Sequence, residues 1–228
     1  MRQRGRKGTK GEATRQHVLD VALDLFRRRG FERTTMRDIA GAAELSLGAA
    51  YHYFPSKEAL VMAYYEWMQA EHERRATAAC SDLRDLKAKL LAVFHTKLEL
   101  LRRDRKILAA LFRNLGDPSH SLSVFGRQTA AVRDRSIAQF QAVFEDPDMP
   151  QDLQKLLGRA VWLAHLGVFL FFIHDRSEGE FRTTKLIAAL VDFVAWAAPL
   201  LRQRIAAPVR RRLMALVAEL GFAPGVPA

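Results

Sequence analysis

Apolar residues recur every three to four positions along the chain, which is the spacing of a helix with one buried face. The first such segment runs from Thr14 to Gly30, and three arginines before the glycine complement the negative end of a helix. A second segment starts at Thr35, which can cap it, with Asp38 at the third position of a capping box. After a brief turn a third segment covers residues 47–54. The pattern therefore predicts three short helices before residue 55.

The rest of the chain keeps the same helical spacing. Pro55 and Ser56 end the third helix, and Ser56 can cap a longer one that follows. Further helices are predicted over residues 83–101, 106–115, 129–144, 153–174, 184–200 and 208–220. We therefore expect an all-α protein. Its parts are a basic arm at residues 1–11, a three-helix helix-turn-helix domain at residues 12–60, and a larger helical domain at residues 61–228.

The charge of the chain favours a polyanionic partner. Lys and Arg together number 36 against 25 Asp and Glu, which gives a formal charge of +11. Such an excess is typical of proteins that bind nucleic acid or an acidic membrane surface, although a GC-rich genome that favours Arg codons is an alternative. The arm holds five cations without an acid: Arg2, Arg4, Arg6, Lys7 and Lys10. It either follows DNA or is a solvated tail.

Cysteine usage and the N-terminal residues favour a cytoplasmic protein. Cys80 is the one cysteine of the sequence, so an intrachain disulfide is excluded and a reducing compartment fits. The N-terminal residues are basic and carry no apolar stretch of the kind found in a signal peptide. The longest apolar run, residues 160–173, is shorter than the roughly 20 residues that span a bilayer. We expect a buried helix there and no membrane partner.

Two short helices at residues 35–43 and 47–54, joined by a tight turn, predict a helix-turn-helix. The second helix of such a motif can enter the major groove of DNA, which is about 12 Å wide, and present side chains to base edges. The segments GFERTTMRDIA at residues 30–40 and SLGAAYHYFPSKEAL at residues 46–60 resemble the DNA-binding segment of the TetR family. The resemblance covers about fifty residues, from Thr14 to Leu60.

The resemblance implies a role in DNA contact for eight residues. Thr35 and Lys57 match positions that meet phosphates, and for Lys57 the start of the following helix adds free N–H groups and a positive dipole end. Tyr51 and Tyr53 match positions that reach the DNA backbone or groove. Base contacts are implied for Leu47, Gly48, Ala49 and His52. The small residues offer few hydrogen bonds, so we expect DNA shape to supply part of the specificity.

Two details of this segment can be tested against a structure. Tyr51 and Phe54 are three residues apart and could share a helix face; we expect Phe54 to pack in the core and Tyr51 to face DNA. Glu44 occupies the turn where many family members have Gly. A left-handed backbone there would cost Glu roughly 1 kcal/mol relative to Gly.

For the larger domain the resemblance implies an effector cavity and a dimer interface. The effector is expected to be a small, largely apolar molecule that releases the protein from DNA, with no cofactor. Candidate lining residues are Phe94, His95, Phe112, Trp162, His165 and Phe169, although an ordinary helical core would contain the same residue types. Residues 153–174 and 184–200 are the dimer candidates. The first is apolar on all sides, so it packs either on a partner or wholly within one chain.

Other function classes find little support. The seven histidines form no HExxH arrangement, and neither a glycine-rich phosphate loop nor a nucleophile elbow is present, so an enzyme is not expected. A regulator that responds to a metal, or that activates transcription, is the alternative. His72 stands between Glu71 and Glu73, but adjacent helical residues do not share a face, and we expect a solvated surface rather than a metal site.

Overall fold

The computed structural model describes residues 10–112, 117 and 120–219, and helices account for nearly all regular structure there. The α-helices are α1 Lys10–Arg29, α2 Met36–Ala42, α3 Leu47–Tyr53, α4 Lys57–Cys80, α5 Leu86–Leu101, α6 Arg105–Phe112, α7 Ala130–Val143, α8 Gln151–His174, α9 Phe181–Arg202 and α10 Ala207–Glu219. Three short 3-10 turns join them: η1 Arg102–Asp104, η2 Glu178–Glu180 and η3 Arg204–Ala206. The described residues contain no strand, so the expected all-α class is confirmed.

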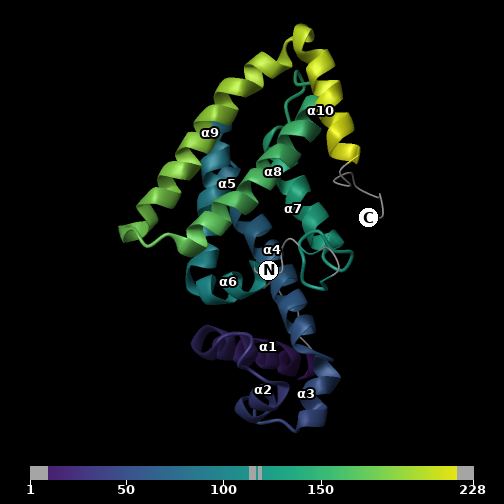
Figure 1. The fold of residues 1–228 in the computed structure, drawn as a ribbon, viewed down its shortest axis with the longest axis vertical. Helices are drawn as coiled ribbons and strands as arrows, with labels where there is room; N and C mark the ends of the chain where they lie inside the picture. Colours follow the sequence, from purple (N-terminus) through teal and green to yellow (C-terminus); the bar gives the residue numbers. More distant parts are fainter. Residues whose placement is uncertain (1–9, 113–116, 118–119, 220–228) are drawn as a thin grey trace, which may run out of the picture.

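The helices form a small group and a larger bundle (Figure 1). Helices α1, α2 and α3 gather at one end of the molecule, and α4 runs from them into the bundle. In the bundle α4 packs on α5, α7 packs on α8, and α9 packs on α5 and α8. Helix α6 lies between the bundle and α1, because it contacts both α8 and α1.

Helix α1 organises the small group. It buries Val18, Ala22 and Phe26, which are spaced four residues apart and therefore share one face. It ends where Gly30 adopts a φ of +88° and donates its N–H to the carbonyl of Phe26 at 2.9 Å, as a glycine after a helix commonly does. The expected end of the basic arm is wrong, because Lys10 already belongs to α1. The other arm cations, Arg2, Arg4, Arg6 and Lys7, lie outside the described residues.

Helix α8 is the central helix of the bundle. It buries Leu153, Val161 and Trp162 among other residues, and Gly158 allows its close approach to α7. A Cβ built on Gly158 would lie 2.8 Å from the Cα of Gln141, so this position of α8 has no room for a side chain. The C-terminal half of α8 exposes Leu170 and Phe171, so the alternative in which this helix is wholly buried within one chain is wrong.

Two segments are long and apolar enough to cross a membrane by length and composition alone, namely Gln151–His174 and Glu178–Arg202. Half of the most apolar window of the first is buried inside the protein, so packing accounts for its composition. In the second only 22% of the window is buried. Many apolar side chains of this segment, among them Phe193 and Trp196, are therefore exposed in the single chain.

Candidate DNA-binding face and effector cavity

The expected capping box at the start of α2 is confirmed. Thr35 Oγ1 accepts the N–H of Asp38 at 3.2 Å, and Asp38 Oδ2 accepts the N–H of Thr35 at 2.8 Å. Asp thus takes the place that Glu or Gln usually has. Hydrogen bonds from Thr35 hold the pKa of the Asp38 carboxyl below its ordinary value, so it stays ionised and favours the helix start. The motif therefore begins at a position determined by two local hydrogen bonds.

The turn between α2 and α3 needs a left-handed residue, and Glu44 is that residue. Its φ is +56°, which costs a side-chain-bearing residue roughly 1 kcal/mol more than glycine. Flanking hydrogen bonds hold the turn: Leu45 donates its N–H to the carbonyl of Ala40 at 2.9 Å, and Ser46 Oγ accepts the N–H of Ala49 at 3.1 Å. The departure from glycine therefore strains the turn without disrupting the motif.

Helix α3 buries one side and exposes the other. Ala50 is fully buried and Phe54 is 1% exposed, whereas Tyr51 is 46% exposed. The expected division between Phe54 in the core and Tyr51 at the surface is therefore confirmed. Leu47, Gly48 and His52 are exposed as well, and Ala49 and Tyr53 are partly exposed. The residues implied to contact bases are thus open to an approaching partner, while the other side of α3 holds it against α1 and α2.

The structure brings Thr35, Tyr51 and Lys57 together on one surface cleft of about 320 Å³. Lys57 Nζ donates to the carbonyl of Phe31 at 2.9 Å and lies 4.4 Å from the centroid of the Phe31 ring. An ammonium has three protons, so this contact orients Lys57 and leaves donors for an anion. Three of the four residues implied to reach the DNA backbone or groove wall therefore share one site at the start of α4, and Tyr53 does not line it.

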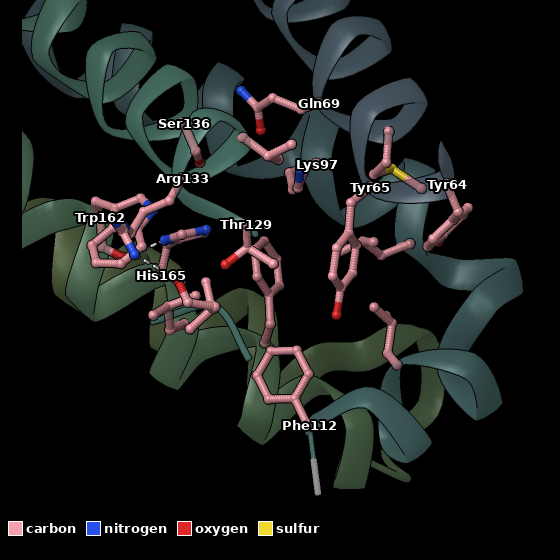
Figure 2. Close-up of a pocket in the computed structure, with 17 residues that line it drawn as sticks. Tyr64, Tyr65, Gln69, Lys97, Phe112, Thr129, Arg133, Ser136, Trp162 and His165 are labelled. Carbon is pink, nitrogen blue, oxygen red and sulfur yellow. Dashed lines mark hydrogen bonds between the residues drawn. The ribbon is translucent and has the colours of Figure 1, made fainter. Parts of the chain in front are cut away.

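A second cavity, partly open to the surface, is lined by residues of α4, α5, α6, α7 and α8 (Figure 2). Its volume is about 120 Å³, and its wall is mostly apolar and aromatic. Four of the six residues expected to line an effector cavity do line this one: Phe112, Trp162, His165 and Phe169. The wall also includes polar side chains that were not predicted from the sequence, such as Lys97, Thr129, Arg133 and Ser136.

The expectation that Phe94 and His95 line the cavity is wrong. Phe94 is buried elsewhere in the core, with its ring centroid 5.6 Å from that of Phe140. His95 is exposed. Successive helical residues are about 100° apart, so the face of α5 that carries Lys97 and Leu101 to the cavity turns His95 toward solvent.

Two buried histidines stay neutral. His165 lines the cavity between the rings of Phe140 and Phe169, at centroid distances of 4.9 and 5.1 Å, and burial lowers its pKa to about 3. Its Nδ1 contacts the carbonyl oxygen of Trp162, which can only accept, so Nδ1 carries the proton.

The expectation of a solvated surface at His72 is wrong. The His72 side chain is buried, and its Nε2 donates to the carbonyl of Val93 at 2.9 Å. The described residues contain no metal-ligating cluster.

The comparisons with known proteins decide the family. Residues 18–64 match the family described as bacterial regulatory proteins, tetR family, and residues 89–205 match the tetracyclin repressor-like C-terminal domain. Together the two matches cover more than half of the chain. The chain belongs to the TetR family. It is therefore a DNA-binding regulator of transcription and not an enzyme.

Individual TetR-family relatives agree. An uncharacterized HTH-type transcriptional regulator of Mycobacterium tuberculosis is 30% identical over 183 residues, which is 80% of this chain and 84% of the relative. The repressor KstR2 of Rhodococcus jostii is 48% identical over 54 residues, 23% of this chain and 26% of its own length. A tetR-family regulator from Streptomyces coelicolor has the same fold, with a TM-score of 0.61, 24% identity, and coverage of 91% of this chain and 90% of its own. FadR of Thermus thermophilus, solved with lauroyl-CoA, also has a similar fold, with a TM-score of 0.58 and 23% identity. The match covers 83% of this chain and 96% of FadR.

A buried carboxylate connects the cavity of this TetR-family protein to α1. Tyr64 lines the cavity and donates its hydroxyl proton to Asp104 Oδ2 at 2.7 Å. Arg27 of α1 donates from Nε to Asp104 Oδ1 at 2.6 Å. Burial raises the pKa of Tyr64, so its hydroxyl remains a donor. These residues could not be predicted from the sequence, because 77 positions separate Arg27 from Asp104 and no local pattern relates them.

Proposed function

We propose that this TetR-family regulator is a cytoplasmic, ligand-responsive repressor that binds a near-palindromic operator as a homodimer. A small, largely apolar molecule in the bundle cavity releases it from DNA. The observation that carries the ligand response is the Tyr64–Asp104–Arg27 connection: one side chain both touches the cavity and, through one carboxylate, holds the first helix of the DNA-binding group. Any molecule that displaces Tyr64 therefore acts on α1.

For DNA recognition, α3 enters the major groove and its exposed side places Leu47, Gly48, Ala49 and His52 against bases. Tyr51 and Tyr53 reach the backbone or the groove wall. Thr35 and Lys57 bind phosphates from the cleft that they share with Tyr51, where the N-terminus of α4 adds its own N–H groups. The support for these roles is the outward position of each side chain together with the family match.

The dimer forms through α8 and α9 and their copies. On α9 Phe193 is 61% exposed and Trp196 is 64% exposed, with ring centroids 5.9 Å apart, and on α8 Leu170 and Phe171 are exposed too. Aromatic side chains exposed to this extent on adjacent helix turns are typical of an interface. A four-helix contact buries them and sets the spacing of the two α3 helices.

The effector occupies the cavity lined by Phe112, Trp162, His165 and Phe169. An apolar cavity of about 150 Å³ can hold one benzene molecule, so the 120 Å³ found here suits about one ring without rearrangement. Larger ligands require the cavity to open. The FadR structure of similar fold was solved with lauroyl-CoA, which supports small-molecule control in a protein of this architecture.

Selection of bound duplexes from random DNA tests the operator. An enriched inverted repeat is expected, since a two-fold protein matches a two-fold site; failure to enrich any inverted repeat would refute the proposed operator. A small-molecule screen for release then follows on the enriched duplex.

Sedimentation of the full chain tests the interface. Phe193→Asp should give monomers that keep their helical content and lose operator binding, while Phe193→Leu, which keeps an apolar side chain, stays dimeric. A Phe193→Asp variant that remains a dimer and still binds the operator would place the interface elsewhere.

A further inference from the structure

The cavity contains a cation without a counter-ion. Lys97 on α5 is 9% exposed, and its side chain forms part of the cavity wall. Among the residues that the structure describes, Lys97 Nζ forms no hydrogen bond, and no carboxylate oxygen lies within 4.0 Å of it. Glu73 is the acid whose charge acts on it, but Glu73 already accepts hydrogen bonds from Arg135 at 3.1 Å and Gln69 at 3.2 Å. Lys97 is therefore a largely buried cation whose ammonium borders the open space of the cavity and has no acceptor among the described residues of the protein.

The rest of the wall adds no negative charge. None of the described lining residues is Asp or Glu, and His165 is neutral. Arg133 also lines the cavity, but it donates to the carbonyls of Val124 and Gly126, both at 3.3 Å, and its Nε lies 3.6 Å from Asp134 Oδ1, so Arg133 is already paired and Lys97 is the unpaired cation of the described wall. In Figure 2 Lys97 lies among the lining residues with Tyr65 on one side and Arg133 and His165 on the other. The cavity is apolar in surface and positive in charge.

A buried ammonium without a partner is unfavourable. Burial lowers the pKa of Lys97 to about 8, so most molecules still carry the charge at neutral pH. A bound oxyanion would supply both the counter-charge and the acceptors that the wall lacks, through charge-assisted hydrogen bonds that are about twice as strong as neutral ones. A saturated chain bound in the same place would leave the ammonium facing methylene groups.

We propose that the effector is an apolar acid whose carboxylate, or an equivalent oxyanion, pairs with Lys97 while its apolar part packs against Trp162 and Phe169. This inference rests on the proposed function, because it specifies the chemistry of the molecule that the cavity takes. The 120 Å³ volume suits about one aromatic ring, so a ring that carries a short acidic chain requires the cavity to open slightly. The proposal excludes effectors that carry a cation at the same end.

Three probes with one carbon skeleton separate these classes: phenylacetate, 2-phenylethanol and 2-phenylethylamine. Their binding to the full chain is measured at pH 7 by calorimetry and by the change in tryptophan fluorescence, to which Trp162 of the cavity wall contributes together with Trp67 and Trp196. The dissociation constant of phenylacetate should be about tenfold lower than that of the alcohol, a difference of about 1.4 kcal/mol, and the amine should bind most weakly. Equal or tighter binding of the alcohol or the amine, or binding of none of the three, overturns the proposal.

Two matched variants of α5 test whether Lys97 causes the preference for phenylacetate. Lys97→Met removes the ammonium from an otherwise similar unbranched side chain and should remove the preference for phenylacetate while preserving affinity for the alcohol. Lys87→Met, at an exposed position of the same helix, should leave both affinities unchanged. If the preference survives in Lys97→Met, the proposal is wrong. The comparison of probes on the unmodified chain needs no variant, so it stands even if a variant fails to fold.

The same proteins separate this inference from the proposed function. Operator selection is performed without any probe, so its failure refutes operator binding and says nothing about charge. A chain that selects an operator and is released by the alcohol but not by phenylacetate refutes the assignment of Lys97 alone.

Discussion

Asp104→Asn tests the connection between the cavity and α1. Asn has the size of Asp but no charge, and it can accept only one of the two hydrogen bonds that Asp104 receives, at 2.6 Å from Arg27 and 2.7 Å from Tyr64. Hydrogen bonds to a charged group are worth about 1.5–3 kcal/mol each. The Arg27 side chain is 36% exposed, so solvent screens its share, whereas the Asp104 side chain is 3% exposed and the Tyr64 hydroxyl is buried.

We therefore expect Asp104→Asn to lower the free energy of unfolding by about 2–3 kcal/mol, most of it from the Tyr64 contact. Urea unfolding at pH 7 measures this value. A double-mutant cycle with Tyr64→Phe and Arg27→Gln gives the coupling of each pair to Asp104. In hydrogen exchange, α1 of Asp104→Asn should exchange faster while α9 keeps its protection. Unchanged stability together with unchanged protection of α1 would refute the connection.

Three further predictions address packing, pH and DNA. Gly158→Ala should destabilise the protein by about 1–3 kcal/mol, because the new Cβ meets the α7 backbone at 2.8 Å. Gly167→Ala on the same helix is the control, because its Cβ would meet nothing within 4 Å. Equal melting temperatures of the two variants would contradict the predicted clash. Burial sets the pKa of His165 at about 3, below the 6.5 of the unfolded chain, so the unfolded state binds the extra proton and stability falls as pH drops from 6.5 toward 3. His165→Gln should flatten that decline in urea unfolding, and an unaltered slope would count against it. Lys57→Ala should weaken binding to every duplex and lower the slope of log K against log salt concentration by about one. His52→Ala should instead change the preference among operator variants by about 1–3 kcal/mol. Uniform weakening by His52→Ala would show that His52 reads no base.

Local chemistry made the helix-turn-helix predictable from the sequence. The capping box of Thr35 and Asp38, and the opposite exposure of Tyr51 and Phe54, depend on residues within four positions of one another. Such contacts follow from the helical period and from hydrogen-bond chemistry alone. The left-handed conformation of Glu44 could be anticipated for the same reason, because the tight turn imposes it.

The cavity was harder to predict, because its wall comes from five helices. Aromatic content selected Phe94, which packs elsewhere, since an aromatic residue on an amphipathic helix suits core and cavity equally. Lys97 could have been predicted as a lining residue from the sequence. It follows Phe94 by three positions and precedes Leu101 by four, so a charged residue interrupts the apolar stripe of α5. Asp104 had no such signal, because its partners lie 40 and 77 positions away.

The position of α6 gives the proposed effector a second way to act on the DNA-binding group. Phe112 of α6 lines the bundle cavity and also lines the cleft between α6 and α1, beside Gly30 and Phe31. A ligand that moves Phe112 therefore changes the surface on which α1 rests, in addition to loading the Asp104 connection through Tyr64. An effector with a hundredfold preference for one arrangement supplies about 2.7 kcal/mol. The Asp104 hydrogen bonds are worth a similar amount, so such a ligand can break them, and a dimer whose two α1 helices have shifted no longer matches the spacing of its half-sites.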